Sequence, residues 1–187
     1  MKSVSEEIGD PRILELLKKY INTGYVDKNG TLYKPEHGTP QGGILSPLLA
    51  NVVLHRLDKF MQEEKNRFDK GNKRRKNPAY ASLQAKKGKS SDLAIRKKVL
   101  AEMRKVRRSD AFDPNYRRLK YIRYADDFVV LIAGPLQDAR HIRAKVKDVL
   151  KAKCGLELNP EKTSINNMTE RWNFLGAEIR KLKANET

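Results

Sequence analysis

Cysteine, histidine and long apolar runs are scarce in this sequence. Its single cysteine, Cys154, cannot form an internal disulfide, which suits a reducing cytosol. No apolar run approaches the roughly 20 residues that a membrane-spanning helix needs. His37, His55 and His141 are scattered and have no cysteine partners, so a zinc site is not expected. These absences argue against a disulfide-stabilised domain, a membrane-spanning protein and a zinc-binding module.

Positive charge is abundant but unevenly distributed. The 187 residues include 40 Lys+Arg and 23 Asp+Glu, a net charge of +17. Residues 59–120 hold 21 basic and 7 acidic residues, a net of +14, whereas the other 125 residues carry a net of only +3. This concentration favours a polyanionic partner, because neutralised phosphates release counterions. A solvated basic segment is the alternative.

Apolar periodicity and capping residues predict four helices. Asp10 and Pro11 suit the start of the first helix, and Ser46 and Pro47 suit the start of the second. The predicted helices cover residues 10–22, 46 to about 67, 92–108 and 136–153. Residues 70–91 have little apolar patterning and are predicted to form a mobile or RNA-ordered loop.

Short apolar runs predict strands between these helices. The dipeptide Asn29-Gly30 favours a tight hairpin turn between the first two strands. The predicted strands cover residues 25–27, 31–34, 119–124, 128–133, 156–158, 163–165 and 172–179. Helices mixed with short antiparallel strands indicate an α+β domain that is long enough to bury a core.

Two adjacent carboxylates, Asp126 and Asp127, lie between apolar runs in the string Tyr-Ala-Asp-Asp-Phe-Val-Val. The strands would be buried, and the acids would sit at the exposed tip. Carboxylates this close repel each other unless a divalent cation binds between them, and Mg²⁺ suits oxygen ligands of this kind. A plain Asp-Asp turn is the alternative, because aspartate is favoured in turns.

A loop rich in glycine and proline precedes the second helix, in the string Gly-Thr-Pro-Gln-Gly-Gly-Ile-Leu-Ser-Pro-Leu-Leu-Ala-Asn. Gly42 and Gly43 would let a nucleotide or template strand approach the backbone closely. Gln41 offers an amide that both donates and accepts hydrogen bonds. A well-capped connector between a strand and a helix is the alternative.

These two strings together resemble the signature motifs of group II intron reverse transcriptases, and the run from Leu48 to Asp58 is similar to that lineage more than to viral enzymes. The resemblance implies a partial polymerase palm, a ferredoxin-like antiparallel sheet with packed helices, carrying a basic helical insertion. It implies RNA-directed DNA synthesis and splicing assistance as a maturase. The expected partners are intron RNA, an RNA template, a DNA primer and deoxynucleoside triphosphates, in the bacterial cytoplasm or an organelle.

The resemblance also implies roles for single residues. Asp126 would be the main metal ligand and Asp127 a supporting one, while Gln41, Gly42 and Gly43 would shape the nucleotide and template site. Lys162, in a block similar to the next family motif, would lie near the triphosphate, although a plain surface lysine is the alternative. The string Phe174-Leu175-Gly176 resembles the turn that grips the primer end, and a buried strand with a Gly bend is compatible with that role.

The basic segment looks like the insertion with which group II intron proteins grasp their own RNA. Its paired cations would contact phosphates of structured RNA, largely by shape and charge. The residues expected to do so are Lys73, Arg74, Arg75, Lys76, Lys86, Lys87, Lys97, Lys98, Arg107 and Arg108.

The chain is expected to divide into three parts. Residues 1–58 would carry the end of the fingers and the start of the palm, residues 59–120 the RNA-binding insertion, and residues 121–187 the palm with the Asp-Asp hairpin. Members of the family that this chain resembles complete a two-metal site with a further aspartate on an earlier apolar strand, and residues 1–9 contain no such block. The third ligand is therefore expected outside this chain.

This chain alone is accordingly not expected to extend a primer efficiently. Apolar surface left by absent palm strands would favour self-association. Two other functions stay open: a non-catalytic RNA-binding or splicing module, and a reverse transcriptase of a retron, diversity-generating or defence system. The retained carboxylate pair argues against the first alternative, and the basic insertion argues against the second.

Overall fold

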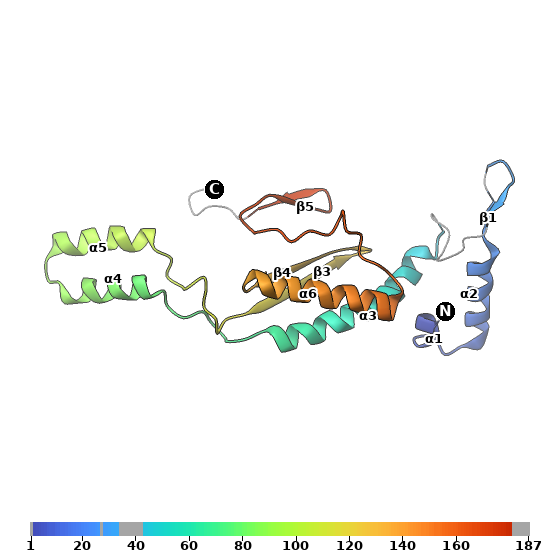
Figure 1. Cartoon of the computed structure of the whole chain (residues 1–187), viewed down its shortest axis with the longest axis horizontal. Helices are drawn as coiled ribbons and strands as arrows, with labels where there is room; N and C mark the ends of the chain where they lie inside the picture. Colours follow the sequence, from blue (N-terminus) through green and yellow to red (C-terminus); the bar gives the residue numbers. More distant parts are fainter. Residues whose placement is uncertain (1, 27, 34–42, 181–187) are drawn as a thin grey trace. The chain divides into compact units, whose positions relative to one another are not determined.

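The computed structural model describes residues 2–26, 28–33 and 43–180 (Figure 1). The chain forms two compact units. The first comprises residues 1–63, 121–129 and 143–187, and the second comprises residues 64–120 and 130–142. The described part contains six α-helices and three two-stranded sheets, each formed by strands that follow one another in the chain. This mixture confirms the α+β class. The second unit is larger than the expected insertion, so the predicted division at residues 58 and 120 stays a prediction.

The first unit begins with two helices, α1 (Lys2–Ser5) and α2 (Pro11–Thr23). The predicted start of α2 is confirmed, because the Asp10 side chain accepts a hydrogen bond of 2.8 Å from the backbone N–H of Arg12. Gly24, at φ 77°, ends the helix. Strands β1 (Tyr25–Val26) and β2 (Leu32–Tyr33) then pair. Val26 pairs with Leu32, so five residues connect the strands instead of the expected two-residue turn.

Helix α3 (Ser46–Phe68) matches its prediction and supplies much of the core. Leu57 and Met61, one helical turn apart, are completely buried, and Leu54 is nearly so. Helix α6 (Leu136–Val149) buries Ile142 and Val146 in the same way. The predicted helix over 136–153 was wrong only at its end, where a single π-helical turn (Leu150–Cys154) replaces α-helix before Gly155.

As predicted, β3 (Arg118–Tyr124) and β4 (Asp127–Ala133) form a hairpin, which carries Asp126 and Asp127 at its turn. Strands β5 (Trp172–Phe174) and β6 (Ala177–Ile179) form a third hairpin. The predicted strands over 156–158 and 163–165 were wrong, because those residues have no strand pairing in the described part of the chain. A three-residue apolar run forms a strand only when a neighbour pairs with its backbone.

The prediction of a loop over 70–91 was also wrong. Residues 78–89 form helix α4 (Pro78–Lys89), which lies beside α5 (Leu93–Lys105) as a helical hairpin in the second unit (Figure 1). The Asn77 side chain caps α4 by accepting a 3.0 Å hydrogen bond from the N–H of Ala79, and Pro78 occupies the first helical position. No residue of α4 is buried. The helix therefore needs no apolar periodicity, and the lack of that periodicity led to the wrong prediction of a loop.

No helix among the described residues has the length and apolar character needed to cross a bilayer.

Candidate active site and nucleic-acid interface

Asp126 and Asp127 lie at the exposed tip of the β3–β4 hairpin, as the sequence predicts. Ala125 and Asp126 form the turn, and Asp127 is the first residue of β4. Ala125 has a φ of 52°, a left-handed conformation that is costly for a residue with a Cβ. Both carboxylates are solvent-exposed, so a cation and a substrate can reach them.

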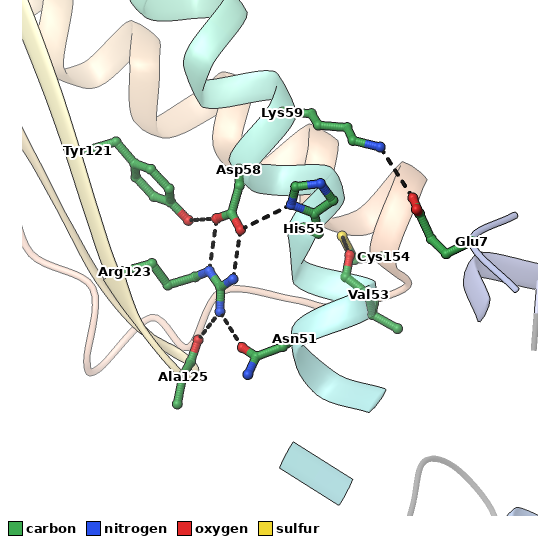
Figure 2. A network of polar contacts seen from close by, with 10 residues as sticks. All are labelled: Glu7, Asn51, Val53, His55, Asp58, Lys59, Tyr121, Arg123, Ala125 and Cys154. Carbon is green, nitrogen blue, oxygen red and sulfur yellow. Dashed lines mark hydrogen bonds and ion pairs between the residues drawn. The ribbon is translucent and has the colours of Figure 1, made fainter. Parts of the chain in front are cut away.

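A polar network fastens this hairpin to α3 (Figure 2). The Arg123 guanidinium on β3 donates to both oxygens of Asp58 on α3, from Nε to Oδ1 at 2.8 Å and from Nη2 to Oδ2 at 2.7 Å. Tyr121 donates its hydroxyl proton to Asp58 Oδ1 at 2.9 Å, and His55 Nδ1 lies 3.7 Å from Oδ2. Asn51, two turns before Asp58, accepts a 2.8 Å hydrogen bond from Arg123 Nη1.

The network shifts the ionisation of its members. The hydrogen bond from Arg123 holds the pKa of Asp58 below its usual value, and Tyr121 contributes in the same direction. Burial raises the pKa of Tyr121, and its hydrogen bond to the Asp58 carboxylate raises it further. The hydrogen bond to Asp58 likewise raises the pKa of Arg123. The pair is therefore charged at every physiological pH.

Sequence reasoning overlooked Asn51, Asp58 and Arg123 as members of the site. One signal was available for each side of the network. Asn51 and Asp58 are seven residues apart, which places both on one face of a helix. Arg123 shares the alternation of Leu119 and Tyr121 along β3, which predicts an inward side chain, and a guanidinium there requires an acidic partner.

The glycine-rich loop lies only partly within the described residues. Gln41 and Gly42 fall outside them, so their predicted roles are untested. Gly43 is described, and its carbonyl accepts a 3.0 Å hydrogen bond from the N–H of Ser46, the first residue of α3. The helix that follows this loop is thus the same helix that holds β3 through Asn51 and Asp58, and Gly43 and the carboxylate pair belong to one unit.

The other predicted residues lie elsewhere in the first unit. Lys162 is in an exposed turn whose backbone N–H groups bond to the Asn159 side chain. Among the described residues, no hydrogen bond or ion pair links Lys162 to Asp126 or Asp127. Phe174 ends β5, and Leu175 and Gly176 form a two-residue turn with φ values of 53° and 78°. Positive φ at both positions is the pattern of a type I′ hairpin turn.

Carboxylate oxygens at Asp126 and Asp127 are the donors that Mg²⁺ prefers. Their exposure at a turn would leave room for waters and phosphate oxygens around a bound cation. The part of the chain that the structure describes contains no group of three or more acidic, histidine or cysteine side chains placed to hold a metal. Asp126 and Asp127 fit a metal held jointly with substrate phosphates or with a further carboxylate.

The second unit has a hydrogen-bonded base where the chain enters and leaves the α4–α5 hairpin. The backbone segments at Lys70 and Arg117 exchange hydrogen bonds of 3.0 and 3.1 Å, and residues 76 and 109 form a second bridge. Gly71 accepts a hydrogen bond from Arg118. The Tyr116 ring receives two guanidinium groups, with Arg74 at 4.9 Å and Arg118 at 4.5 Å from its centroid.

Two cations expected to bind RNA take part in this base. Arg74 donates to the carbonyl of Ala111 at 2.6 Å, and Arg75 pairs with the Asp110 carboxylate at 2.8 Å. The other residues expected to contact RNA have exposed or half-buried side chains. They are Lys73, Lys76, Lys86, Lys87, Lys97, Lys98, Arg107 and Arg108.

A shallow groove on α4 and α5 gathers several cations that the sequence did not single out. Arg96 and Arg104 line it together with the predicted Lys87 and Lys97. Leu93, Leu100 and Ala101 line the same groove. Four cations beside apolar side chains suit a ligand with phosphates and bases.

Comparison with known proteins gives a consistent result. The family model described as reverse transcriptase (RNA-dependent DNA polymerase) matches residues 5–179. The group II intron-encoded protein LtrA of Lactococcus lactis subsp. cremoris is 36% identical over 187 residues, covering 95% of this chain and 31% of its own length. A COX1/OXI3 intron 1 protein of Saccharomyces cerevisiae is 34% identical (96% of this chain, 22% of its own length). Nuclear intron maturase 1, mitochondrial, of Arabidopsis thaliana is 27% identical (71% and 17%). The chain therefore spans less than a third of each of these relatives.

Proposed function

Because this chain belongs to the reverse transcriptase family, we propose that it supplies the carboxylate hairpin of an RNA-directed DNA polymerase encoded by a group II intron. One observation carries the proposal. Two exposed aspartates stand at the tip of a β-hairpin that is clamped to the helix following the Gly43 loop. This arrangement offers oxygen ligands to a cation and an open approach for a nucleic-acid end.

In this proposal Asp126 and Asp127 hold Mg²⁺, which would lower the pKa of the primer hydroxyl and neutralise charge on the phosphates. Gln41, Gly42 and Gly43 line the nucleotide and template side, and Lys162 offsets the charge of the leaving pyrophosphate. The turn at Phe174–Gly176 contacts the primer end. Similarity to LtrA and to a maturase supports the lineage.

We also propose that the second unit binds intron RNA during splicing. The net charge of +14 over residues 59–120 supports it. The α4–α5 groove supports it too, because Lys87, Arg96, Lys97 and Arg104 present cations beside apolar surface. Arg74 and Arg75 would then act mainly by keeping the base of the unit rigid.

The polymerase proposal is tested with a chimera in which residues 5–179 replace the matching segment of LtrA. Primer extension on an RNA template with Mg²⁺ is expected for the chimera and is expected to fall by at least about a thousandfold in Asp126→Asn. Asp148→Asn, an exposed aspartate on α6, is the matched control and should leave the rate unchanged. An active Asp126→Asn chimera would remove the assignment. A chimera that binds RNA but makes no DNA would favour the splicing module.

The RNA proposal is tested on the chain itself with a stem-loop RNA between 50 and 200 mM salt, a range over which contacts to phosphates weaken markedly. The slope of log K against log salt is negative, and replacing both Lys87 and Lys97 by alanine should make it shallower by about 2. The matched control replaces Lys18 and Lys19 on α2, outside the second unit. Equal slopes for both double variants would contradict a specific role of the groove.

A further inference from the structure

We propose that Arg123 is a positioning residue that fixes the turn presenting Asp126, with Asp58 and Asn51 holding its guanidinium in place. The proposal rests on the metal-binding role given above to Asp126. Arg123 itself does not touch the metal or the substrate. It acts on the backbone carbonyl of Ala125 (Figure 2), the residue that precedes Asp126 in the turn.

The decisive contact is made to the turn itself. Arg123 Nη1 donates a 2.6 Å hydrogen bond to the carbonyl oxygen of Ala125. That carbonyl belongs to the planar peptide group that ends in the N–H of Asp126. Holding the oxygen restrains the plane, and the plane together with the φ angle of Asp126 sets the direction in which its Cα–Cβ bond leaves the turn.

The turn needs such a contact because its backbone is strained. Ala125, at φ 52°, occupies a left-handed conformation that is unfavourable for a residue with a Cβ. Conformations of this kind persist where surrounding contacts over-determine them. Arg123 supplies one of those contacts from two residues earlier on β3.

The guanidinium is held on its other sides by α3. Asp58 accepts from Nε and Nη2 in a bidentate pair, and Asn51 Oδ1 accepts from Nη1, the same nitrogen that reaches Ala125. The Arg123 side chain is 13% exposed, and its pair with Asp58 is partly buried, which limits competition from solvent for that pair. A planar fork with several fixed donors makes this arrangement possible, and a lysine ammonium cannot reproduce it.

A purely electrostatic role for Arg123 makes the opposite prediction. A cation beside the carboxylate pair disfavours a second cation there, so removing the arginine charge would tighten metal binding. A positioning role predicts weaker binding after the same change, because the carboxylate loses its orientation. The sign of the change therefore separates the two roles.

The experiment measures Mn²⁺ binding to the 187-residue chain by the EPR signal of the free ion. Arg123→Lys and Arg123→Leu are each expected to weaken binding about tenfold, the lower end of the loss typical of residues that orient metal ligands. Arg171→Lys and Arg171→Leu are matched controls, because Arg171 forms an exposed ion pair with Glu178 on the β5–β6 hairpin. Asn51→Ala is a second variant that keeps the proposal testable if the Arg123 variants unfold. It lies at an exposed position on α3, removes one hydrogen bond to Arg123, and should weaken Mn²⁺ binding by a smaller factor.

Asp126→Asn separates this proposal from the one on which it rests. Loss of Mn²⁺ binding in Asp126→Asn and in the folded Arg123 variants supports both. Loss in Asp126→Asn with unchanged affinity in Arg123→Lys and Asn51→Ala overturns the positioning role alone. Tighter binding by Arg123→Leu also overturns it, in favour of electrostatics. Unchanged binding in Asp126→Asn overturns the metal site itself.

Discussion

Asp113 accepts a 2.7 Å hydrogen bond from the backbone N–H of Arg75, which lies 38 residues earlier in the chain. Its second oxygen accepts from the N–H of Asn115 at 2.9 Å. One carboxylate thus joins the two segments that lead into and out of the α4–α5 hairpin. The hydrogen bond from Arg75, followed by that from Asn115, keeps the pKa of Asp113 below its usual value.

Replacing Asp113 by asparagine should lower the urea midpoint of unfolding. The amide keeps one acceptor oxygen but turns an NH₂ group toward one of the two N–H donors, which then loses its partner. Circular dichroism of the chain in urea measures the effect. Asp148→Asn on the exposed face of α6 is the control, and an equal midpoint in both variants would contradict a structural role of Asp113.

Gly71→Ala should destabilise the base of the second unit by more than about 1 kcal/mol, the usual cost of a left-handed backbone for alanine. Gly71 has a φ of 71°, and an added Cβ would overlap the backbone oxygen of Asn115. Gly88, in the last turn of α4, has nothing within 4 Å of an added Cβ. Gly88→Ala should therefore stabilise the chain by about 0.5–1 kcal/mol. Thermal unfolding of both variants checks the contrast, and changes of the same sign would contradict it.

Much of this fold follows from local sequence rules. The strands around Asp126, the cap at Asp10 and the course of α3 were all predictable from period and capping residues. Helix α4 was not, because it buries no side chain and depends on Asn77 and on its neighbour α5. An apolar pattern reports burial, so a helix that buries nothing is invisible to it.

The candidate site divides in the same way. The carboxylate pair and Gly43 were found as motifs, whereas the Asp58–Arg123 clamp required tertiary structure, because 65 residues separate its partners. Among the described residues other than glycine, only Ala125 and Leu175 have positive φ. Both lie in turns that the resemblance linked to catalysis or primer contact. Strain at such positions departs from sequence preference, as expected at functional sites.

Asp58 should make stability depend on acid pH. Its folded-state pKa lies below the unfolded value because Arg123 donates hydrogen bonds to it. The stabilisation is therefore present above the unfolded pKa of about 3.9 and is lost as the pH falls through the folded pKa. Asp58→Asn should lower the free energy of unfolding by about 2 kcal/mol at pH 7. Below a pH of about 5, the free energy of unfolding should change less with pH in this variant than in the unchanged chain. Urea titrations across that range measure both slopes, and parallel curves would refute the linkage.

Cys154 should react slowly with alkylating reagents. Burial raises the pKa of its thiol, and the Sγ atom lies 3.5 Å from the carbonyl oxygen of Val53 (Figure 2). Less thiolate is present at neutral pH than for a free cysteine, and the thiolate is the reactive form. Iodoacetamide labelling of the folded chain should therefore be slower than labelling of the same chain in urea. Equal rates would show that the fold neither shields the thiol from the reagent nor raises its pKa.

Leu175→Asn should stabilise the β5–β6 hairpin. Leucine at φ 53° is strained by about 1–2 kcal/mol, whereas asparagine tolerates this region and would create an Asn-Gly pair suited to a type I′ turn. The expected gain in thermal unfolding is about 1 kcal/mol. Leu156→Asn is the control, since Leu156 is similarly exposed but does not have positive φ, and it should give no gain. A gain accompanied by slower primer extension in the LtrA chimera would assign the strained leucine to the primer end. A gain with unchanged extension would contradict that assignment, because the leucine side chain would then contribute strain without contact.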